Sequence, residues 1–134
     1  MRVILDTNVF VSGIFWTGAP FRILEAWQGK KIKPIFSQEI LNEYNRVAHI
    51  LAQKYKQKNI IEIIELLLIY GEIATPSCLK EAVSRDPDDD KFIACALGAD
   101  CPIIVSGDKD LLTISGYQEI NILTPAEFVK NYLD

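Results

Sequence analysis

Two aspartates each follow a short apolar run in the sequence. Asp6 comes directly after residues 3–5, and Asp108 follows residues 102–106 with one glycine between them. Unbroken apolar runs of this length are typical of parallel strands that are covered on both faces, and ligands of open parallel sheets bind outside the carboxyl ends of the strands. We therefore expect both carboxylates at one edge of a sheet, although Asp6 and Asp108 would also suit the turns and helix starts that follow them.

A third carboxylate, that of Glu43, lies within the apolar stripe of a predicted helix. The stripe has helical spacing and consists of Ile40, Tyr44, Val47, Ala48 and Leu51. Glu43 comes three residues after Ile40 and four before Val47, so the helix aims its carboxylate inward, while Glu39 and Asn42 face water. A carboxylate turned toward a core needs a partner, which is either an Arg or Lys side chain or a cation shared with Asp6, unless Glu43 lies at the edge of the stripe and reaches water.

Residues 86–90 are unusually acidic, with four Asp residues within five positions. Helix-start chemistry explains some of them, because Asp86 suits the N-cap, Pro87 the first helical position and Asp89 a capping place three residues later. The helix dipole stabilises each favourable charge by only about 0.3–1 kcal/mol, which is less than the repulsion among these acids, so a cation would relieve the site. Asp89 and Asp90 lie four and three residues before Ile93, and spacing leaves open which of them points along the buried face.

Carboxylates of this kind form a site with oxygen ligands only. Asp6, Glu43, Asp108 and either Asp89 or Asp90 would suit one or two Mg²⁺ or Mn²⁺ ions. Two such ions are suited to phosphodiester hydrolysis, in which one activates water and the other stabilises the leaving oxygen. No His, Ser or Cys nucleophile is then required, and the lone His49 is expected to lie away from the site.

The elements that must position these acids alternate between strands and helices. Strands are predicted at residues 3–5, 33–36, 72–74, 102–106 and 120–123, and helices at 21–28, 38–54, 57–70, from the acidic stretch to 97, and at 125–133. A loop that contains Gly13, Gly18 and Pro20 is expected after the first strand. This alternation implies an α/β fold with a mainly parallel sheet and helices on both faces.

Length and composition favour one domain that spans residues 1–134. With 134 residues, of which 49% are hydrophobic, the chain can bury a sizeable core. It has no apolar run long enough to span a membrane and no signal-peptide pattern at its start, so a cytoplasmic protein is expected. Cys78, Cys95 and Cys101 lack CxxC spacing, which indicates small core residues and neither a disulfide framework nor a zinc site.

The net charge of −4 argues against a broadly basic surface for nucleic acid. Bound cations would offset the acids of the site and leave two lysine clusters free to face phosphates. These clusters are Lys30, Lys31 and Lys33, and Lys54, Lys56 and Lys58. Each cluster taken alone is equally consistent with a solvated helix end or loop.

In its motifs the chain resembles the PIN-domain ribonucleases, of the kind found as toxins in prokaryotic toxin–antitoxin pairs. The resemblance is carried by residues 5–8, 37–43, 86–93 and 105–112, in this order and at this spacing, and it covers almost the whole chain. It implies a three-layer α/β/α sandwich with about five strands.

The resemblance also assigns roles to individual residues. It implies that Asp6, Glu43, Asp89 or Asp90, and Asp108 bind Mg²⁺ or Mn²⁺, with Asp110 as a further ligand, and that Thr7, Asn8 and Ser106 support these ligands or contact the substrate. The implied activity is that of a metal-dependent endoribonuclease with RNA as its substrate and a cognate antitoxin as a partner.

Two other functions remain as alternatives. One is a binding module that has kept the PIN fold with weak or no catalysis. The other is a Mg²⁺-dependent phosphotransfer protein on a similar sheet, which is disfavoured because Asn8 stands where a D-x-D site has its second acid.

The helix predicted at residues 57–70 is rich in Ile and Leu on nearly all sides. A helix of this composition must be covered, either by the rest of the domain or by a homodimer or antitoxin interface.

Overall fold

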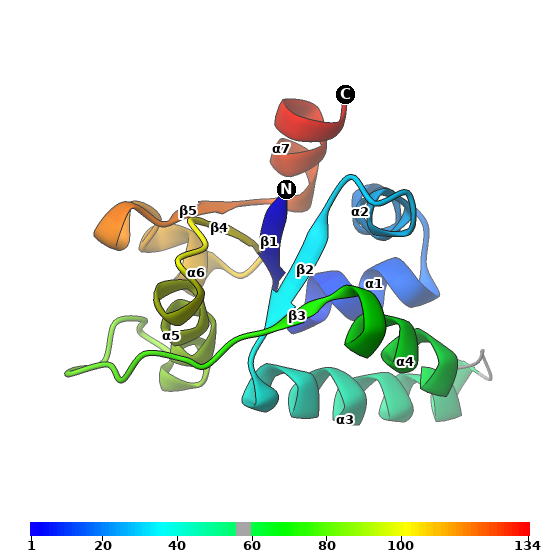
Figure 1. Cartoon of the computed structure of the whole chain (residues 1–134), viewed down its shortest axis with the longest axis horizontal. Helices are drawn as coiled ribbons and strands as arrows, with labels where there is room; N and C mark the ends of the chain where they lie inside the picture. Colours follow the sequence, from blue (N-terminus) through cyan, green and yellow to red (C-terminus); the bar gives the residue numbers. More distant parts are fainter. Residues whose placement is uncertain (56–59) are drawn as a thin grey trace.

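The computed structural model describes residues 1–55 and 60–134 and has a five-stranded sheet at its centre (Figure 1). The strands are β1 (Arg2–Leu5), β2 (Lys33–Phe36), β3 (Glu72–Ile73), β4 (Ile103–Val105) and β5 (Asn121–Leu123). They lie in the order β3-β2-β1-β4-β5, and every neighbouring pair is parallel. Ile4 in the central strand pairs with Ile35 on one side and Ile104 on the other. The predicted α/β fold is therefore confirmed.

Helices occupy the connections between the strands. They are α1 (Thr7–Phe15), α2 (Ala19–Gln28), α3 (Gln38–Tyr55), α4 (Ile60–Tyr70), α5 (Asp90–Ala99), α6 (Lys109–Thr113) and α7 (Pro125–Phe128). Short 3₁₀ turns at Pro87–Asp89 and Tyr117–Glu119 precede α5 and β5, and a π-helical segment, Val129–Leu133, continues α7. Within the described chain, no helix combines the length and the apolar character needed to cross a bilayer.

The strand order reverses direction between β1 and β4. From β1 the chain winds outward through β2 to β3, and then it crosses back to β4 and β5. Because parallel crossovers are right-handed, the connections of these two halves cover opposite faces of the sheet. The boundary between β1 and β4 is thus the topological switch point, where open α/β sheets bind their ligands beyond the carboxyl ends of the strands.

The residues after β1 form a helix and not the predicted loop. In α1, Val9, Phe10 and Ile14 are buried. A Cβ at Gly13 would lie 2.7 Å from both the Leu24 side chain and the Pro20 carbonyl oxygen. The glycine therefore permits the close approach of α1 and α2. The prediction that Gly13 lies in a loop is wrong, because this glycine is needed for helix packing.

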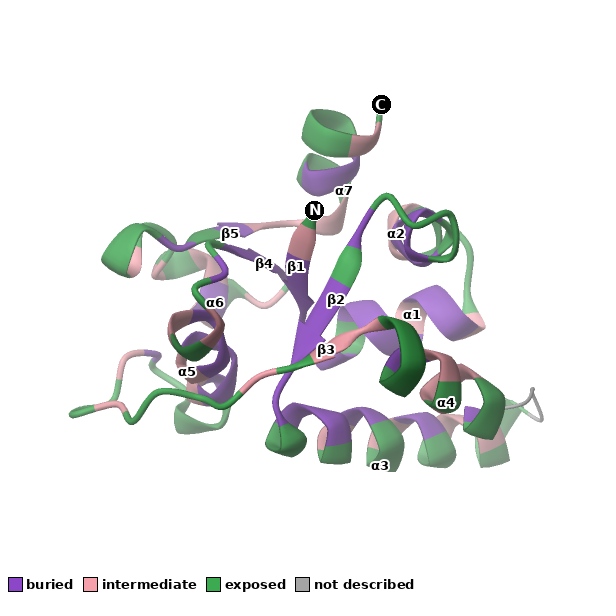
Figure 2. Ribbon diagram, in the orientation of Figure 1, coloured by how far each residue is buried: buried purple, intermediate pink, exposed green. Residues whose placement is uncertain are grey.

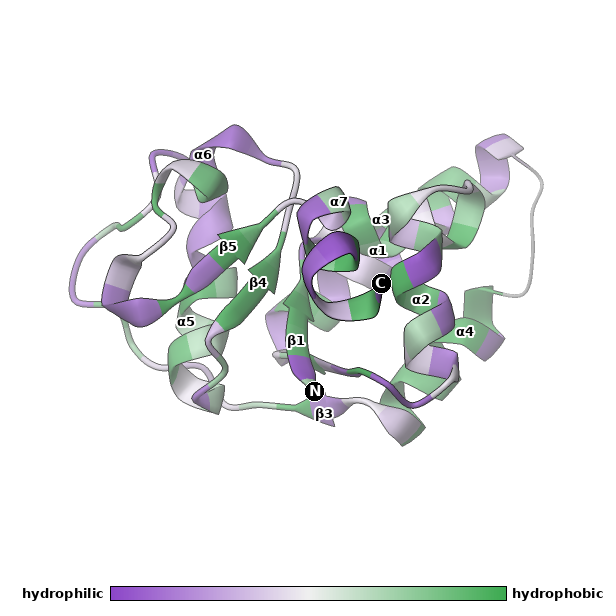
Figure 3. Cartoon of the chain, turned by 90° about the horizontal axis from the view of Figure 1, so that it is seen from above, coloured by the Kyte–Doolittle hydropathy of each residue, from purple (hydrophilic) through white to green (hydrophobic). Residues whose placement is uncertain are grey.

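Hydrophobic residues fill the sheet and the facing sides of the helices, as Figure 3 shows along β1, β4 and β5. Burial is less complete on α4, where only Ile60 and Leu67 are buried and the outer side is open to solvent (Figure 2). The alternative in which the domain covers this whole helix is therefore wrong for its described residues. The expectation that all three cysteines are core residues is wrong for Cys78, which is exposed in the loop after β3, whereas Cys95 and Cys101 are buried.

Predicted helix starts are confirmed where local chemistry defines them. Thr124 and Glu127 form a reciprocal capping box, with Pro125 in the first turn of α7. Asp86 is the N-cap of the 3₁₀ turn before α5, and its carboxylate accepts a hydrogen bond from the Asp88 N–H at 3.0 Å. The Asp89 side chain makes no cap hydrogen bond, so the capping-box place predicted for it is wrong.

Candidate functional site

Asp6 and Asp108 lie together beyond the carboxyl ends of β1 and β4. The Asp6 side chain is buried, and its Oδ2 accepts a hydrogen bond of 2.6 Å from Ser106 Oγ. The same Ser106 Oγ accepts a hydrogen bond of 3.0 Å from the Asp108 N–H. Ser106 therefore links the two strand ends, and the expectation that both acids share one edge of the sheet agrees with this geometry.

Three carboxylates converge at this edge. Asp89, Asp108 and Asp110 each offer an oxygen within 4.8 Å of those of the other two. Asp108 is held as the N-cap of α6 by the Asp110 N–H at 2.9 Å, whereas Asp89 Oδ2 is buried and has no hydrogen-bond partner among the described residues. A buried oxygen without a partner is costly unless a ligand satisfies it.

The electrostatics of the site reflect this crowding. Burial, and after it the negative charges of Asp108, Asp86 and Asp6, together raise the pKa of Asp89 from 3.8 to about 7. Burial also raises the pKa of Asp6, the hydrogen bond from Ser106 lowers it, and the charge of Asp108 raises it, with a net increase. Several carboxylates so close together hold a proton or a cation more readily than isolated ones do.

Asp90, which spacing could not separate from Asp89, points elsewhere. Its carboxylate oxygens accept hydrogen bonds from the backbone N–H groups of Val83 and Ser84, at 3.1 and 2.7 Å. Asp90 thus holds the loop before α5 against the first turn of that helix. The structure brings Asp89, and not Asp90, together with Asp108 and Asp110.

Glu43 lies at the border of the site with a partner of its own. Its Oε2 is 2.6 Å from Lys91 Nζ, and its Oε1 accepts a hydrogen bond from Thr7 Oγ1. The Glu43 side chain is 17% exposed and that of Lys91 only 4%. The Lys91 ammonium also contacts the Asp88 carboxylate at 3.0 Å, so it neutralises two acids beside the carboxylate cluster. Of the two partners predicted for Glu43, the structure supplies the Lys.

The donor set at this edge fits a hard divalent cation. The three converging side chains are all carboxylates, and one of them buries an oxygen that no hydrogen bond satisfies. Mg²⁺ and Mn²⁺ prefer such oxygen ligands over nitrogen or sulfur. The residues present are therefore compatible with the metal that the fold class implies.

Comparison with known proteins agrees with this geometry. The family model described as PIN domain matches residues 2–110. The chain belongs to the PIN domain family. This is a nuclease family whose members are typically metal-dependent, and the matched segment of the PIN domain runs from the start of β1 to Asp110, so it contains all the acids described above. No curated protein matches the chain.

Lys91 is the residue of the PIN domain site that sequence reasoning missed. Burial lowers its pKa, the contacts with Glu43 and Asp88 raise it, and the net shift is upward, so the side chain stays charged. A signal was present in the sequence, because Lys91 follows Asp88 by three residues, a spacing at which opposite charges meet on a helix. Its contact with Glu43 depends on the packing of α5 against α3 and has no local signal.

Other predicted residues of the PIN domain lie outside the carboxylate cluster. Asn8 is exposed on the first turn of α1. His49 is exposed on α3, with its ring nitrogen 2.7 Å from the Asn45 carbonyl oxygen. Lys56 and Lys58 of the second lysine cluster lie outside the described residues.

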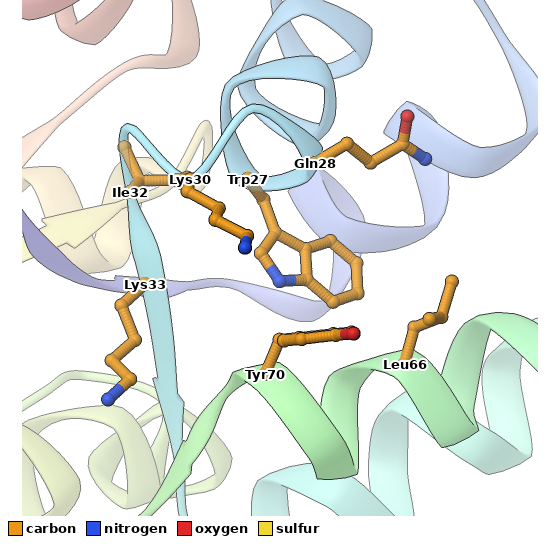
Figure 4. A pocket seen from close by; sticks show the side chains of 7 residues that line it. All are labelled: Trp27, Gln28, Lys30, Ile32, Lys33, Leu66 and Tyr70. Atoms are coloured by element: carbon orange, nitrogen blue, oxygen red, sulfur yellow. The ribbon is translucent and has the colours of Figure 1, made fainter.

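A cavity of about 560 Å³ lies away from these acids (Figure 4). It is lined by Trp27, Gln28, Lys30, Ile32, Lys33, Leu66 and Tyr70. Lys33 begins β2, so the cavity lies toward the amino ends of the strands, whereas the carboxylates gather at the carboxyl ends. Its lining has no acidic side chain and is unsuited to a divalent cation.

Proposed function

We propose that this PIN domain is a Mg²⁺- or Mn²⁺-dependent endoribonuclease that hydrolyses RNA phosphodiester bonds, and that it acts as the toxin of a toxin–antitoxin pair. The observation that carries the nuclease proposal is the convergence of Asp89, Asp108 and Asp110 at the switch point of a PIN domain, with a buried oxygen of Asp89 unsatisfied. Membership of a nuclease family supports the reaction class, and the resemblance noted in the sequence motifs motivates the toxin role.

In this proposal Asp89, Asp108 and Asp110 hold the metal, and Asp6 completes the acidic edge beside them. A bound divalent cation supplies Lewis-acid activation of water and stabilises charge on the phosphate oxygens. Ser106 orients Asp6 and the backbone of Asp108 through its two hydrogen bonds. Lys91 and Thr7 hold the Glu43 carboxylate next to the residue that follows Asp6, and in this proposal Glu43 serves as a further ligand or orients water.

Water is the nucleophile in the proposed reaction. Among the described residues, the hydroxyls nearest the acids are already engaged, because Ser106 donates to Asp6 and Thr7 donates to Glu43. The chain has a single His, which is exposed on α3, and its buried cysteines have pKa values raised by burial, which keeps their thiols protonated. Hydrolysis that uses water requires none of these groups.

The test is a cleavage assay with Asp89→Asn and Asp90→Asn as a matched pair. Both substitutions remove one neighbouring carboxylate, but only Asp89 belongs to the proposed metal site. We expect wild type and Asp90→Asn to cleave RNA with Mn²⁺ and not with EDTA, and Asp89→Asn to be inactive. Calorimetric titration with Mn²⁺ should show weaker binding only for Asp89→Asn. Cleavage that persists with EDTA, or equal loss in both variants, would contradict the proposal.

The same assay separates the alternatives. If the chain is a PIN-fold binding module, the wild-type protein with Mn²⁺ would bind RNA and produce no fragments. A phosphotransfer protein would transfer phosphate from a small donor to the chain and leave the RNA intact. The residue at position 8 is Asn, so the second acid that such a protein uses after its first strand is not present there.

The proposed partners are RNA, a cognate antitoxin and a second copy of the chain. The outer side of α4 presents Ile61, Leu68 and Ile69, with exposures of 63, 53 and 68%. Apolar side chains grouped in this way are typical of a protein interface. We propose that this side of α4 is the interface of a homodimer. If light scattering shows a monomer, the antitoxin is the other partner that this surface would bind.

A further inference from the structure

Two parallel helices lead away from the carboxylate site along one edge of the molecule. α1 and α3 both begin at the carboxyl ends of their strands and run side by side in the same direction (Figure 1). Thr7 contacts Glu43 at the start of the pair, Phe10 stacks on Tyr44 with ring centroids 4.3 Å apart, and Phe15 packs against Tyr55 at the far end. The seam between the helices therefore connects the acids to the end of α3.

An exposed aromatic pair stands at that far end. Trp16 and Tyr55 are 45 and 44% exposed, and their rings meet edge to face with centroids 5.3 Å apart. Lys54 Nζ lies 5.4 Å from the centre of the Tyr55 ring. Aromatic rings beside a cation are the recurrent platform on which proteins stack the bases of single-stranded nucleic acid.

The described residues of α1, and those of α3 beyond Glu43, include no acidic side chain. α1 contains no Asp, Glu, Lys or Arg. Beyond Glu43, the residues of these four types in α3 are Arg46 and Lys54. Arg46, Ile50 and Lys54 are exposed at a spacing of four residues, which places them along one side of α3. In a chain with 18 acidic and 14 basic residues, this track is selectively free of negative charge.

The length of the track suits several nucleotides. From Glu43 to Tyr55 the helix advances about 18 Å, which is about five stacked nucleotide steps. We propose that the Trp16–Tyr55 pair stacks an unpaired base of an RNA strand whose backbone follows Arg46 and Lys54 from the carboxylate site. This inference rests on the proposed nuclease function and adds to it a platform for an unpaired base several nucleotides from the cleaved bond.

Binding in EDTA tests the platform without cleavage, using the fluorescence anisotropy of a labelled, unpaired RNA of about 12 nucleotides. We expect Trp16→Ala and Tyr55→Ala each to raise the Kd roughly tenfold, with a base-paired RNA of the same length bound weakly by all variants. Tyr132→Ala is the matched control, because Tyr132 is 45% exposed and contacts Phe128 on a different helix. Trp16→Phe should restore most of the affinity.

The cation track has a separate readout. Replacing Arg46 and Lys54 with Gln should lower the slope of log K against log salt concentration by about 1.4, because each phosphate contact to a single strand contributes about 0.7. Lys130→Gln, at an exposed position of the C-terminal helix, should leave the slope unchanged. These variants keep the test valid even where loss of an aromatic ring lowers the yield of folded protein.

Cleavage with Mn²⁺ separates this inference from the proposed function. Trp16→Ala should slow cleavage of the long RNA and leave cleavage of a trinucleotide unchanged, because the short substrate cannot reach the platform. If wild type cleaves neither RNA, the nuclease proposal fails while the anisotropy result still decides the platform. Unchanged Kd values in Trp16→Ala and Tyr55→Ala overturn the inference. So does a change of oligomeric state in these variants without a change in RNA affinity, which would mark the surface as an interface between copies.

Discussion

Lys91 Nζ lies 2.6 Å from Glu43 Oε2, in a contact where the lysine side chain is only 4% exposed. The pair joins α5 to α3. Removing one partner of a buried ion pair leaves the other charge without compensation, which typically costs more than the pair itself contributes.

Lys91→Met should lower the free energy of unfolding by about 3 kcal/mol, because Glu43 then stays buried with only the Thr7 hydroxyl as partner. The double variant with Glu43→Gln should recover part of this loss. Urea unfolding of the two single variants and the double variant measures the coupling. The exposed Arg22–Asp134 pair is the control, and its removal should leave the stability nearly unchanged, because solvent screens exposed charges. A similar cost for both pairs would contradict the buried role of Lys91.

The Asp89 carboxylate should lower the melting temperature when no metal is bound and raise it when Mn²⁺ is bound. In EDTA, Asp89→Asn should raise the melting temperature, because it removes a carboxylate that is repelled by Asp108 and Asp6. Asp90→Asn should lower the melting temperature, since the Asp90 carboxylate accepts two backbone hydrogen bonds. Mn²⁺ at about a hundredfold excess over its Kd should stabilise wild type by about 2.7 kcal/mol and Asp89→Asn by less. Equal stabilisation of both proteins would exclude Asp89 as a ligand.

Stability in EDTA should fall as the pH rises toward neutrality. The pKa of Asp89 is about 7 in the folded chain and 3.8 in its ordinary state, so the folded protein binds more protons between these values. The stability contributed by the protonated form is complete below the lower value and is lost as the pH passes the higher one. Urea midpoints between about pH 5 and 8 measure this slope, and Asp89→Asn should flatten it. A slope that is the same in the variant would assign the effect to other groups.

The cleavage products should carry 5′-phosphate and 3′-hydroxyl ends. Attack by water on phosphorus expels the 3′ oxygen and leaves the 2′-hydroxyl unused. Enzymes that use the 2′-hydroxyl leave a cyclic phosphate and generally need a base such as His, whereas the single His of this chain is exposed on α3. Mass spectrometry of the fragments identifies the ends, and cyclic phosphate termini would refute the water mechanism.

Assembly through α4 should respond to two neighbouring leucines in different ways. Leu68 is 53% exposed, so Leu68→Glu should keep its fold and shift the light-scattering mass from dimer to monomer. Leu67 is fully buried, so Leu67→Glu should unfold the domain. A wild-type monomer at every concentration would leave the antitoxin as the occupant of this surface, and unfolding of Leu68→Glu would show that the residue is internal.

Local signals in the sequence were sufficient for most of the fold. Apolar runs of strand length predicted β1 and β4, and the capping box at Thr124 predicted the start of α7, because both depend on contacts within a few residues. The same local interpretation failed at Gly13, whose role depends on Leu24 of the neighbouring helix. Glycine frees the backbone and also permits close packing, and sequence alone does not distinguish the two uses.

The sequence by itself determined that Asp6 and Asp108 meet, because carboxylates that end parallel strands share one edge of the sheet. Only the tertiary structure decided between Asp89 and Asp90. The first turn after Asp86 is a 3₁₀ turn, and α-helical spacing does not give side-chain directions there. The backbone N–H groups of Val83 and Ser84 donate hydrogen bonds to the Asp90 carboxylate, whereas the Asp89 carboxylate lies close to that of Asp108. A side chain's direction at a helix start depends on which distant groups satisfy it, and those contacts exist only once the chain has folded.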